Sequence, residues 1–423
     1  MRALLLGSGG RESALAWALS RSSVVDDLVA APGNPGIARH AELHDVDASD
    51  PAAVVALAAE VGAGLVVVGP EVPLVAGVGD ALRAEGRLVF GPDAAAARIE
   101  GSKSYAKKLM VDAGIPTGAS GTFTSVDEAV SFMDRLGPPY VVKADGLAAG
   151  KGVVVTEARA AAVAAIEERL VGGIFGDAGR DVVIEEYLDG EEASVIAFTD
   201  GRTVVPCQPA QDYKRVHDGD SGPNTGGMGS YSPVPACPDA LVEQIVAEVL
   251  EPMVAATAAA GAPFSGALYA GLSLTSSGPK VIEFNARFGD PETQAILPRL
   301  ESDFGEAVLA VASGDLAGVK LEWSPDACVT LVLASGGYPG PHETGFRIHG
   351  LDRVPDDVLV FHAGTRSEGE GVVTAGGRVL NLSARGKDFA EARQRAYDAA
   401  RVVEFENVHY RTDIAARAVG KDR

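Results

Sequence analysis

The sequence predicts a multidomain α/β and α+β protein. We expect an N-terminal doubly wound parallel sheet, a central domain with a mobile flap subdomain, and a small C-terminal β-rich α/β domain. Short apolar runs alternate with alanine-rich helical stretches over residues 1–100, the composition shifts towards lysine and glycine from Gly101, and β-rich runs resume after Trp323. A chain of 423 residues is long enough for roughly two to four domains with separate cores.

Residues 1–100 form the first expected domain. A buried strand leads into a glycine loop and a helix, and the later strands stop at Pro-Gly or Gly-Pro steps. Strands that alternate with helices pair in parallel, because each helix crosses over to the next strand. The expected elements are strands at Ala3–Leu6, Leu28–Ala30, Leu65–Val68 and Leu88–Phe90 and a helix over Glu12–Ser20.

Residues 101–322 and 323–423 form the second and third expected domains, and the flap covers about 120–190. Residues 206–235 are rich in Gly, Pro, Asp and Asn, and we interpret this long stretch as a functional loop. The expected helices are Ser102–Asp112, Asp127–Leu136 and Phe389–Val403, and the expected strands are Tyr140–Lys143, Val182–Ile184, Ala193–Phe198, Cys328–Ala334, Val358–His362 and Arg378–Leu382.

The composition excludes several classes of protein. A formal net charge of −22 repels nucleic acid, so any anionic substrate must meet locally placed cations or backbone N–H groups. The three cysteines form no C-x-x-C pair, and the seven histidines form no H-E-x-x-H motif, so nothing indicates zinc. No stretch is apolar enough to span a membrane, and the first apolar run is too short for a signal peptide. We expect a cytoplasmic protein.

The most informative segment is 281–294, VIEFNARFGDPETQ. Side chains alternate along a strand, so Glu283, Asn285 and Arg287 share one face while Ile282 and Phe284 point into a core. A carboxylate and an amide oxygen form a hard ligand pair that suits Mg²⁺ held jointly with nucleotide phosphates. Arg287 can hold a carboxylate or a phosphoryl group in a planar fork. On this segment alone, a polar edge strand with an ion pair explains the pattern equally well.

The first glycine loop, GSGGRE at 7–12, lies between a strand and a helix. It fails the dinucleotide pattern G-x-G-x-x-G, because Glu12 stands where the last glycine belongs. Backbone N–H groups at the start of a helix, with Arg11 nearby, fit a lone phosphate better. A tight turn that needs glycine for backbone reasons is the alternative.

The second glycine loop, VVKADGLAAGKGV at 141–153, connects two expected strands and carries Lys143 and Lys151. Small residues let backbone N–H groups close over phosphate oxygens, and the lysines add positive charge. It is not a Walker A loop, because no G-K-[ST] opens a helix. We interpret it as a flap over ATP. Downstream, IEEYLDGEE at 184–192 reads as a hinge that pairs with adenine and ribose, or as an acidic surface turn.

Taken in order, these motifs resemble the glycinamide ribonucleotide synthetases (phosphoribosylamine–glycine ligases) of the ATP-grasp superfamily over essentially the whole chain. The long 211–233 motif and GDPETQ are the most specific. The carriers are GSGGRE (7–12), APGNPG (31–36), GPEVPL (69–74), IEGSK (99–103), VVKADGLAAGKGV (141–153), IEEYLDGEEAS (184–194), QDYKRVHDGDSGPNTGGMGSYSP (211–233), YAGL (269–272), EFNARFGDPETQ (283–294) and SGGYPG (335–340). One departure is Ser13, where the family usually has histidine.

The resemblance implies ATP-dependent ligation of glycine to 5-phosphoribosylamine through glycyl phosphate, a step of purine biosynthesis. Mg²⁺ or Mn²⁺ would lie at Glu283 and Asn285. Glu185 and Leu188 would bind adenine through their backbone groups, and Glu192 would bind the ribose. The implied ATP-binding residues are Lys103, Lys143, Gly146, Gly150, Lys151, Gly152, Glu185, Glu186, Leu188 and Glu192.

The resemblance also implies a substrate end of the site. Arg287 would bind the carboxylate of glycine, and the 5-phosphate would bind at Gly9–Arg11. Asp212 and Asp290 compete for the glycine ammonium, and this choice stays open. The implied substrate residues are Gly9, Gly10, Arg11, Glu12, Asp212, Lys214, Asn224, Thr225, Gly226, Arg287, Gly289 and Asp290, and Arg287, Lys143 and Asp290 would be catalytic.

Three other functions remain as alternatives: another ATP-grasp carboxylate–amine ligase or carboxylase, a nucleotide-binding regulator without turnover, and, from the first loop alone, a dinucleotide-dependent oxidoreductase. We expect a monomer that acts on small molecules, without nucleic-acid or membrane partners. Transient contact with the enzyme that makes phosphoribosylamine is a further hypothesis.

Overall fold

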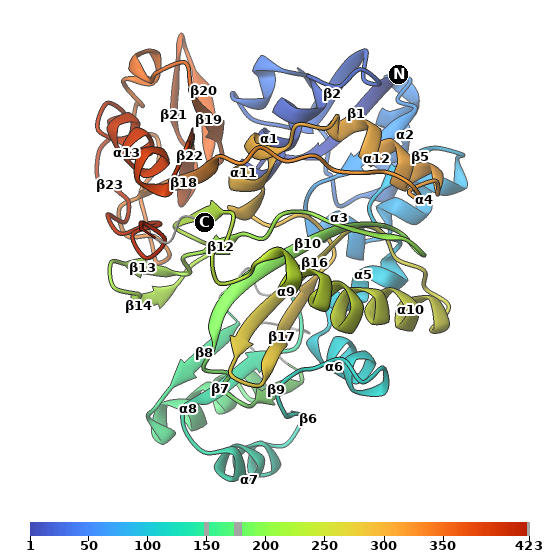
Figure 1. Cartoon of the computed structure of the whole chain (residues 1–423), viewed down its shortest axis with the longest axis vertical. Helices are drawn as coiled ribbons and strands as arrows, with labels where there is room; N and C mark the ends of the chain where they lie inside the picture. Colours follow the sequence, from blue (N-terminus) through green and yellow to red (C-terminus); the bar gives the residue numbers. More distant parts are fainter. Residues whose placement is uncertain (148–151, 173–179, 421–423) are drawn as a thin grey trace.

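The N-terminal sheet is parallel throughout (blue in Figure 1). The computed structural model describes residues 1–147, 152–172 and 180–420. Strands β1 and β4 are buried along nearly their whole length, which is why they read as continuous apolar runs. The sheet order is β3 (Glu42–Leu43), β2 (Asp27–Pro32), β1 (Arg2–Gly7), β4 (Leu65–Val68) and β5 (Leu88–Phe90).

Helices cover both faces of this sheet, as expected for a doubly wound arrangement. The side chain of Asp50 accepts hydrogen bonds from Ala52 N and Ala53 N at the start of α2, where Pro51 is the first helical residue. These helices are α1 (Gly10–Leu19), α2 (Pro51–Glu60), α3 (Glu71–Val75), α4 (Val78–Ala84) and α5 (Ala94–Gly101), with a 3₁₀ turn at Ile37–Arg39.

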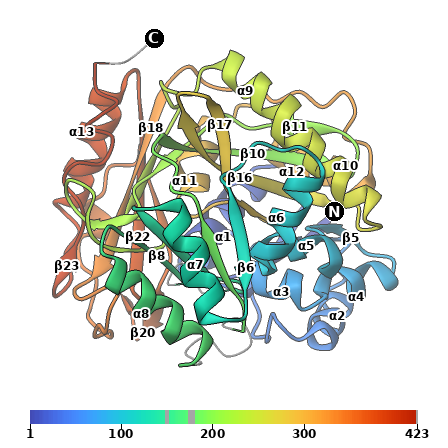
Figure 2. The same ribbon diagram turned by 90° about the horizontal axis from the view of Figure 1, so that it is seen from below.

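The flap is a separate four-stranded antiparallel sheet with two helices against it, at the bottom of Figure 1 and towards the viewer in Figure 2. It has its own small core, which includes Met133, Val142 and Ile166. Its order is β6 (Ser120–Phe123), β9 (Val182–Glu185), β7 (Tyr140–Ala144) and β8 (Val153–Thr156), with α7 (Val126–Leu136) and α8 (Arg159–Leu170), and α6 (Lys103–Asp112) precedes it.

A second four-stranded antiparallel sheet lies in the central part of the molecule. Its two long strands, β10 and β16, are paired over ten residue positions, from Glu191–Leu274 to Asp200–Ser265. The sheet order is β11 (Val204–Pro206), β10 (Glu191–Asp200), β16 (Ser265–Thr275) and β17 (Gly278–Asn285). The helices of this part are α9 (Asp239–Ile245), α10 (Glu251–Ala259), α11 (Glu292–Ile296) and α12 (Phe304–Ser313), with a π-helical turn at Val246–Leu250 and a 3₁₀ turn at Leu297–Arg299.

The third large sheet combines C-terminal strands with two strands from residues 206–235 (orange and green in Figure 1). Its members are β12 (Gln211–Asp212), β15 (Gly229–Ser232), β18 (Ala327–Ser335), β22 (Arg378–Gly386) and β19 (Val358–His362), while β23 (Val408–His409) also pairs with β18. Two hairpins and a helix complete it: β13 (Arg215–His217) with β14 (Ser221–Asn224), β20 (Thr365–Glu368) with β21 (Gly371–Thr374), and α13 (Phe389–Ala400), with a 3₁₀ turn at Leu351–Arg353.

The multidomain fold class predicted from the sequence is confirmed, and two local predictions are wrong. Residues 206–235 are not one loop, because β15 pairs with the distant strand β18 and β12 pairs with β15. No periodicity within the segment reveals a partner that lies about a hundred residues away in the sequence. The last long helix ends at Ala400 rather than Val403. None of the described helices is long and apolar enough to cross a membrane.

Four phenylalanines join the N-terminal sheet to the central sheet. Phe90 of β5 stacks on Phe288 with ring centroids 5.8 Å apart, and Phe198 of β10 meets Phe288 edge-on at 5.6 Å. Phe304 of α12 contacts Phe198 and Phe288. All four are buried, and Phe288 follows directly on Arg287. This cluster therefore anchors the end of the most informative segment between two sheets.

We predict that Phe198→Ala costs about 3–5 kcal/mol of stability, because it opens a cavity at the centre of this cluster. Phe198→Leu retains most of the side-chain volume and should cost clearly less. Urea unfolding followed by tryptophan fluorescence measures both changes. Equal midpoints for Phe198→Ala and the unsubstituted protein would show that the two sheets do not depend on this contact.

Candidate active site

One cavity of about 910 Å³ is lined by all parts of the chain. The N-terminal domain supplies Arg11 and Glu71, and the C-terminal strands and loops supply Tyr338, Arg378 and Arg417. Most of the residues predicted from the sequence line it: Arg11, Lys103, Lys143, Gly152, Glu185, Glu186, Leu188, Glu192, Asp212, Lys214, Asn224, Thr225, Gly226, Glu283, Asn285, Arg287 and Asp290.

Five predicted residues do not line the cavity: Gly9, Gly10, Glu12, Gly146 and Gly289. Two more, Gly150 and Lys151, lie outside the described residues. The predicted phosphate loop at 146–152 is therefore placed only at its two ends.

Strand β17 carries the predicted metal pair, and a β-bulge sets its orientation. Val281 pairs with Leu272 and Glu283 pairs with the adjacent Gly271, so Ile282 is the extra residue on β17. Both Phe284 and Ile282 line the cavity, but Phe284 is buried in the core as predicted, whereas Ile282 is only partly buried and belongs to none of the core clusters of the described residues. Simple alternation failed here because the bulge shifts the phase of the strand by one residue.

Glu283 and Asn285 have the chemistry of a shared magnesium site. Burial alone would raise the pKa of the Glu283 carboxyl, but Lys214, Lys143 and Lys103 outweigh it and hold that pKa below its usual value. Among the described residues, no cluster of three or more His, Cys, Asp or Glu side chains forms a metal cage. An ionised carboxylate and one amide oxygen therefore fit Mg²⁺ that takes its remaining ligands from phosphate and water.

Three buried charges link the flap to α6. Glu185 Oε2 lies 3.0 Å from Lys143 Nζ and 3.0 Å from Lys107 Nζ, and Lys107 also donates to Thr117 Oγ1 at 2.8 Å. Burial opposes ionisation of Glu185, yet the two lysines lower its pKa. The Glu185 side chain is thus a buried ion-pair partner, and its predicted contact with adenine through the backbone stays a prediction.

Lys107 is a functional candidate that the sequence analysis missed. It follows Lys103 by one helical turn on α6, and that i, i+4 spacing was the available signal. Both lysines line the cavity, and burial lowers the pKa of each. Lys103 Nζ donates to Gly146 O at 3.2 Å, so it holds the entrance of the second glycine loop.

The predicted adenine hinge lies along the same cavity. Glu186 pairs with the chain at Ala119 through both its backbone N–H and its carboxylate, at 2.8 and 2.9 Å. Leu188 lines the cavity. Glu192, predicted to bind ribose, forms an ion pair with Lys214. Residues 186–188 leave β9 with the Glu186 backbone hydrogen-bonded and line the cavity. This favours the interpretation as a nucleotide hinge over that of an acidic surface turn.

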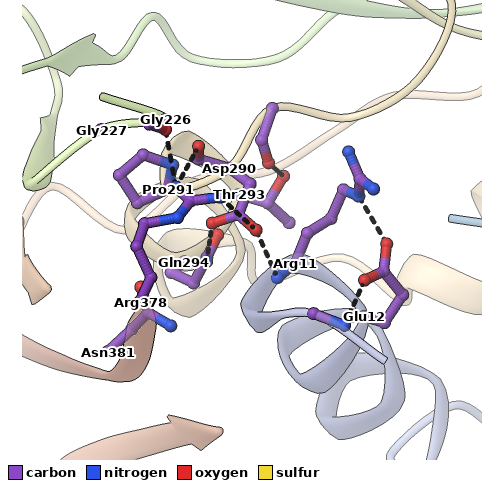
Figure 3. A network of polar contacts seen from close by, with 12 residues as sticks. Arg11, Glu12, Gly226, Gly227, Asp290, Pro291, Thr293, Gln294, Arg378 and Asn381 are labelled. Carbon is purple, nitrogen blue, oxygen red and sulfur yellow. Dashed lines mark hydrogen bonds and ion pairs between the residues drawn. The ribbon is translucent and has the colours of Figure 1, made fainter. Parts of the chain in front are cut away.

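The N-terminus of α1 is occupied by the protein's own carboxylates (Figure 3). Gly9 N donates to Glu12 Oε2 at 2.7 Å, and Arg11 N donates to Asp290 Oδ2 at 3.4 Å. The Arg11 guanidinium donates to Glu12 and to Phe288 O. Gly10 packs under Gln294 and Asn381. Within this loop only Arg11 lines the cavity, so the phosphate assignment rests on that side chain.

Ser13 does not line the cavity. Its side chain is buried, and its Oγ accepts a hydrogen bond from the backbone N–H of His362 on β19 at 3.1 Å. Ser13 therefore connects α1 to the C-terminal sheet. The position at which the sequence departs from the resembled family is therefore an interdomain contact.

Arg287 is held between two acids of the N-terminal domain. Its Nε lies 3.3 Å from Glu71 Oε2 and its NH2 lies 2.7 Å from Glu100 Oε1. Burial opposes its charge, but the two carboxylates raise its pKa above the usual value. Glu100 also accepts from Ala286 N at 2.7 Å. Arg287 is thus a fixed cation at the cavity wall.

The two aspartates that compete for the glycine ammonium differ in their surroundings. Asp290 accepts from Gln294 Nε2 at 2.7 Å and pairs with Arg378 NH2 at 3.3 Å, as Figure 3 shows. These partners and Arg11 lower its pKa despite its burial. Among the described residues, the ion-pair partner of Asp212 is Lys214, at 3.5 Å. Burial, with Glu292 and Glu192 nearby, raises the pKa of Asp212 to about 7.

Glu292 and three C-terminal residues line the cavity but were missed. Glu292 accepts from Tyr269 OH at 2.9 Å, and its place in the quoted GDPETQ motif was a usable signal. Tyr338 OH accepts from Gly226 N at 3.0 Å, and Arg378 donates to Gly226 O at 2.6 Å. Arg417 lines the cavity as well. For these C-terminal residues only the SGGYPG motif, which holds Tyr338, gave any signal.

Family models match nearly the whole chain. Three are described as the phosphoribosylglycinamide synthetase N domain, ATP-grasp (A) domain and C domain, and they match residues 1–100, 101–293 and 328–417. A phosphoribosylamine–glycine ligase of Streptomyces coelicolor is 53% identical and aligns over 99% of this chain and 100% of its own length. One of Agrobacterium fabrum is 49% identical over 100% of both chains.

Solved structures agree with this result. A crystal structure of phosphoribosylamine–glycine ligase from Thermotoga maritima superposes with a TM-score of 0.86 at 34% identity, covering 98% of this chain and 100% of that one. The biotin carboxylase domain of a Hydrogenobacter thermophilus 2-oxoglutarate carboxylase has a TM-score of 0.75 at 17% identity, covering 100% and 98%, and shares the fold.

The fold and the site together define an ATP-grasp carbon–nitrogen ligase. Within that class, the chain belongs to the phosphoribosylamine–glycine ligase family.

We predict that Lys107→Met weakens Mg-ATP binding about tenfold, because Glu185 would lose one of its two cations and draw Lys143 away from the phosphates. Lys108→Met is the matched control, since Lys108 is exposed on the same helix and pairs with Asp112. Isothermal titration with a non-hydrolysable ATP analogue measures the change. If both variants bound the ATP analogue with equal affinity, the assignment of Lys107 to the nucleotide site would be rejected.

Proposed function

We propose that this chain joins glycine to 5-phosphoribosylamine through glycyl phosphate, with cleavage of ATP to ADP and phosphate. The observation that carries the proposal is one cavity that is lined by the pair Glu283 and Asn285, by the lysines Lys103 and Lys143, and by Asp212. Family membership supports the substrates, because the relatives are named for phosphoribosylamine and glycine.

The reaction divides into two displacements. A glycine carboxylate oxygen attacks the γ-phosphorus of ATP and the bond to ADP breaks, which gives glycyl phosphate. The amine of phosphoribosylamine then attacks the acyl carbon, loses a proton, and inorganic phosphate leaves. Phosphoryl transfer of this kind depends on positioning and charge neutralisation. The cavity supplies both without a histidine or cysteine in its lining.

At the nucleotide end, Lys143 and Lys103 bind phosphate oxygens, and Glu185 fixes Lys143 in place. Glu283 and Asn285 would hold Mg²⁺ or Mn²⁺. When bound, the metal neutralises charge on the phosphates. The hinge at Glu186–Leu188 takes the adenine, and Glu192 takes the ribose after releasing Lys214.

At the glycine end, Asp212 binds the ammonium and Arg287 binds the carboxylate. Asp290 is the weaker candidate for the ammonium, because its oxygens already accept from Arg378 and Gln294. Arg287 meets the substrate as a fixed cation, since Glu71 and Glu100 hold it. Preorganised charge of this kind costs little reorganisation during the reaction.

The sugar amine occupies the N-terminal end of the cavity, with Arg11 towards its 5-phosphate. Residues 224–226 close the opposite wall through Tyr338 and Arg378.

We also propose a cytoplasmic monomer. Its three cysteines are buried and unpaired, as is common in a reducing compartment. Light scattering during gel filtration tests the monomer, and a mass of twice 43.3 kDa would reject it.

A coupled ADP assay tests the proposed function. We expect release of ADP only when ATP, Mg²⁺, glycine and phosphoribosylamine are all present. Glu283→Gln should abolish turnover while circular dichroism stays unchanged, because it removes the charged metal ligand. Stimulation by another acid or amine in place of both substrates would favour a different ATP-grasp ligase. Full turnover by Glu283→Gln at saturating Mg²⁺ would reject the metal assignment.

The protonation of Asp212 predicts a pH dependence. A carboxyl group must be ionised to bind an ammonium, and the pKa of Asp212 is raised to about 7. The KM for glycine should therefore fall as the pH rises from about 6 to 8. Asp212→Asn should raise KM about tenfold or more and remove this dependence, whereas Asp290→Asn should retain it. If the pH dependence of the KM for glycine disappeared in Asp290→Asn but persisted in Asp212→Asn, Asp290 would be the residue that binds the ammonium.

A further inference from the structure

A C-terminal segment, residues 409–417, lies along the loop that carries Asp212 and Lys214. Figure 1 shows this dark red segment, which follows β23, beside the green hairpin of β13 and β14. We name residues 409–417 the C-terminal strap and residues 212–226 the substrate loop. The first contact comes from His409, the last residue of β23, whose Nε2 lies 2.8 Å from Val216 O and whose backbone pairs with Ala334 of β18.

Arg411 is the centre of the strap. Its side chain is 0% exposed, and it is absent from the cavity lining. NH1 donates to Arg215 O at 3.0 Å and to Asp220 Oδ1 at 2.8 Å, and the guanidinium lies 4.7 Å from the ring centroid of Tyr213. One buried cation thus touches the substrate loop immediately before Lys214, immediately after it, and at the hairpin turn.

The rest of the strap fastens the same loop. Asp413 accepts both Arg411 Nε at 2.7 Å and Gly219 N at 2.9 Å. Thr412 N donates to Asp218 Oδ1 at 2.8 Å. Arg417 NH2 donates to Asp220 Oδ2 at 3.0 Å. Every one of these bonds joins the strap to residues 215–220 or holds Arg411 in its place.

The loop receives contacts from the strap at its hairpin turn, Asp218 to Asp220, while Val216 of β13 packs against Met228 and Ala334. Its ends are fixed by β12 and β15 in the C-terminal sheet, but β13 and β14 form a two-stranded sheet of their own. Isolated two-stranded hairpins are marginally stable in water. Lys214 lies between β12 and β13 and reaches into the cavity towards Glu192 and Asp212. Lys214 O accepts hydrogen bonds from Thr225 N at 2.7 Å and from Thr225 Oγ1 at 2.8 Å, and the Arg411 contacts at Tyr213 and Arg215 hold the chain on either side of it.

We propose that Arg411 is a positioning residue for the ligation: it sets the backbone of the substrate loop so that Asp212 and Lys214 meet glycine and the acyl phosphate. This inference rests on the proposed function of the cavity. Arg411 acts from outside the cavity, through Arg215 O, Asp220 and the Tyr213 ring. The adenine hinge at Glu186–Leu188 makes none of these contacts. Lys214 also pairs with Glu192, but Glu192 releases it when ribose binds, so we expect the main effect of Arg411 at the substrate end.

The test uses Arg411→Met and Arg411→Lys in the full chain, with Arg401→Met as the matched control, because Arg401 is largely exposed and pairs with neighbouring Asp398. Arg411→Met should raise the KM for glycine about tenfold and lower kcat, with the KM for ATP within about twofold of the parent. Arg411→Lys should recover only part of this loss, since one ammonium cannot replace the planar fork. Arg401→Met should leave all constants unchanged.

A purely structural role predicts a different result. It would lower Tm and scale down kcat with the fraction of folded enzyme, while both KM values stayed the same. That outcome overturns the proposal. Should Arg411→Met fail to fold, Asp413→Asn is the milder test, because it weakens the grip on Arg411 and Gly219 without touching the cavity, and the same selective rise in KM for glycine is expected. If the unsubstituted enzyme itself released no ADP with glycine and phosphoribosylamine, the proposed function would fail instead.

Discussion

The carboxylate of Asp290 is the contact on which the arrangement of the molecule depends. It follows the strand that carries the metal pair, and it accepts from the N-terminus of α1, from Gln294 and from Arg378 of the C-terminal sheet (Figure 3). A buried carboxylate is stable only when such partners surround it, so burial of Asp290 requires three distant parts of the chain to meet. Asp290, Arg11 and Arg378 line the cavity at the point where these three parts of the chain come together.

The charges around that space explain how a chain of net charge −22 can handle anions. Lys143 and Lys107 share Glu185, and Arg287 is shared by Glu71 and Glu100. Each cation is buried beside carboxylates, so its field acts locally in a medium of low polarisability. The long-range field of the protein matters less at these distances than the pairs that line the wall.

The sequence predicted which residues line the cavity better than how the backbone brings them there, and the roles of these residues stay predictions. Glu283, Asn285 and Lys143 could be recognised because their residue types are unusual in a strand, whatever the exact backbone path. The bulge at Ile282 could not be recognised from the sequence, because one inserted residue leaves no trace in the pattern of apolar residues. Arg378 and Arg417 were missed because proximity across the fold is created by the pairing of β15 with β18, which no local signal encodes.

That pairing has a consequence for how the chain is made. Because β12 and β15 belong to a sheet completed by β18 and β22, the middle of the chain stays without its neighbours during synthesis until residues 327–386 have emerged. Contacts of such long sequence separation form late, after loop-closure entropy has been overcome. The N-terminal sheet, whose strands all lie within residues 2–90, has no such delay. A nascent chain can therefore pair all strands of the N-terminal sheet before the last strands of the C-terminal sheet have been made, although one face of that sheet still lacks α12 and its phenylalanine partners.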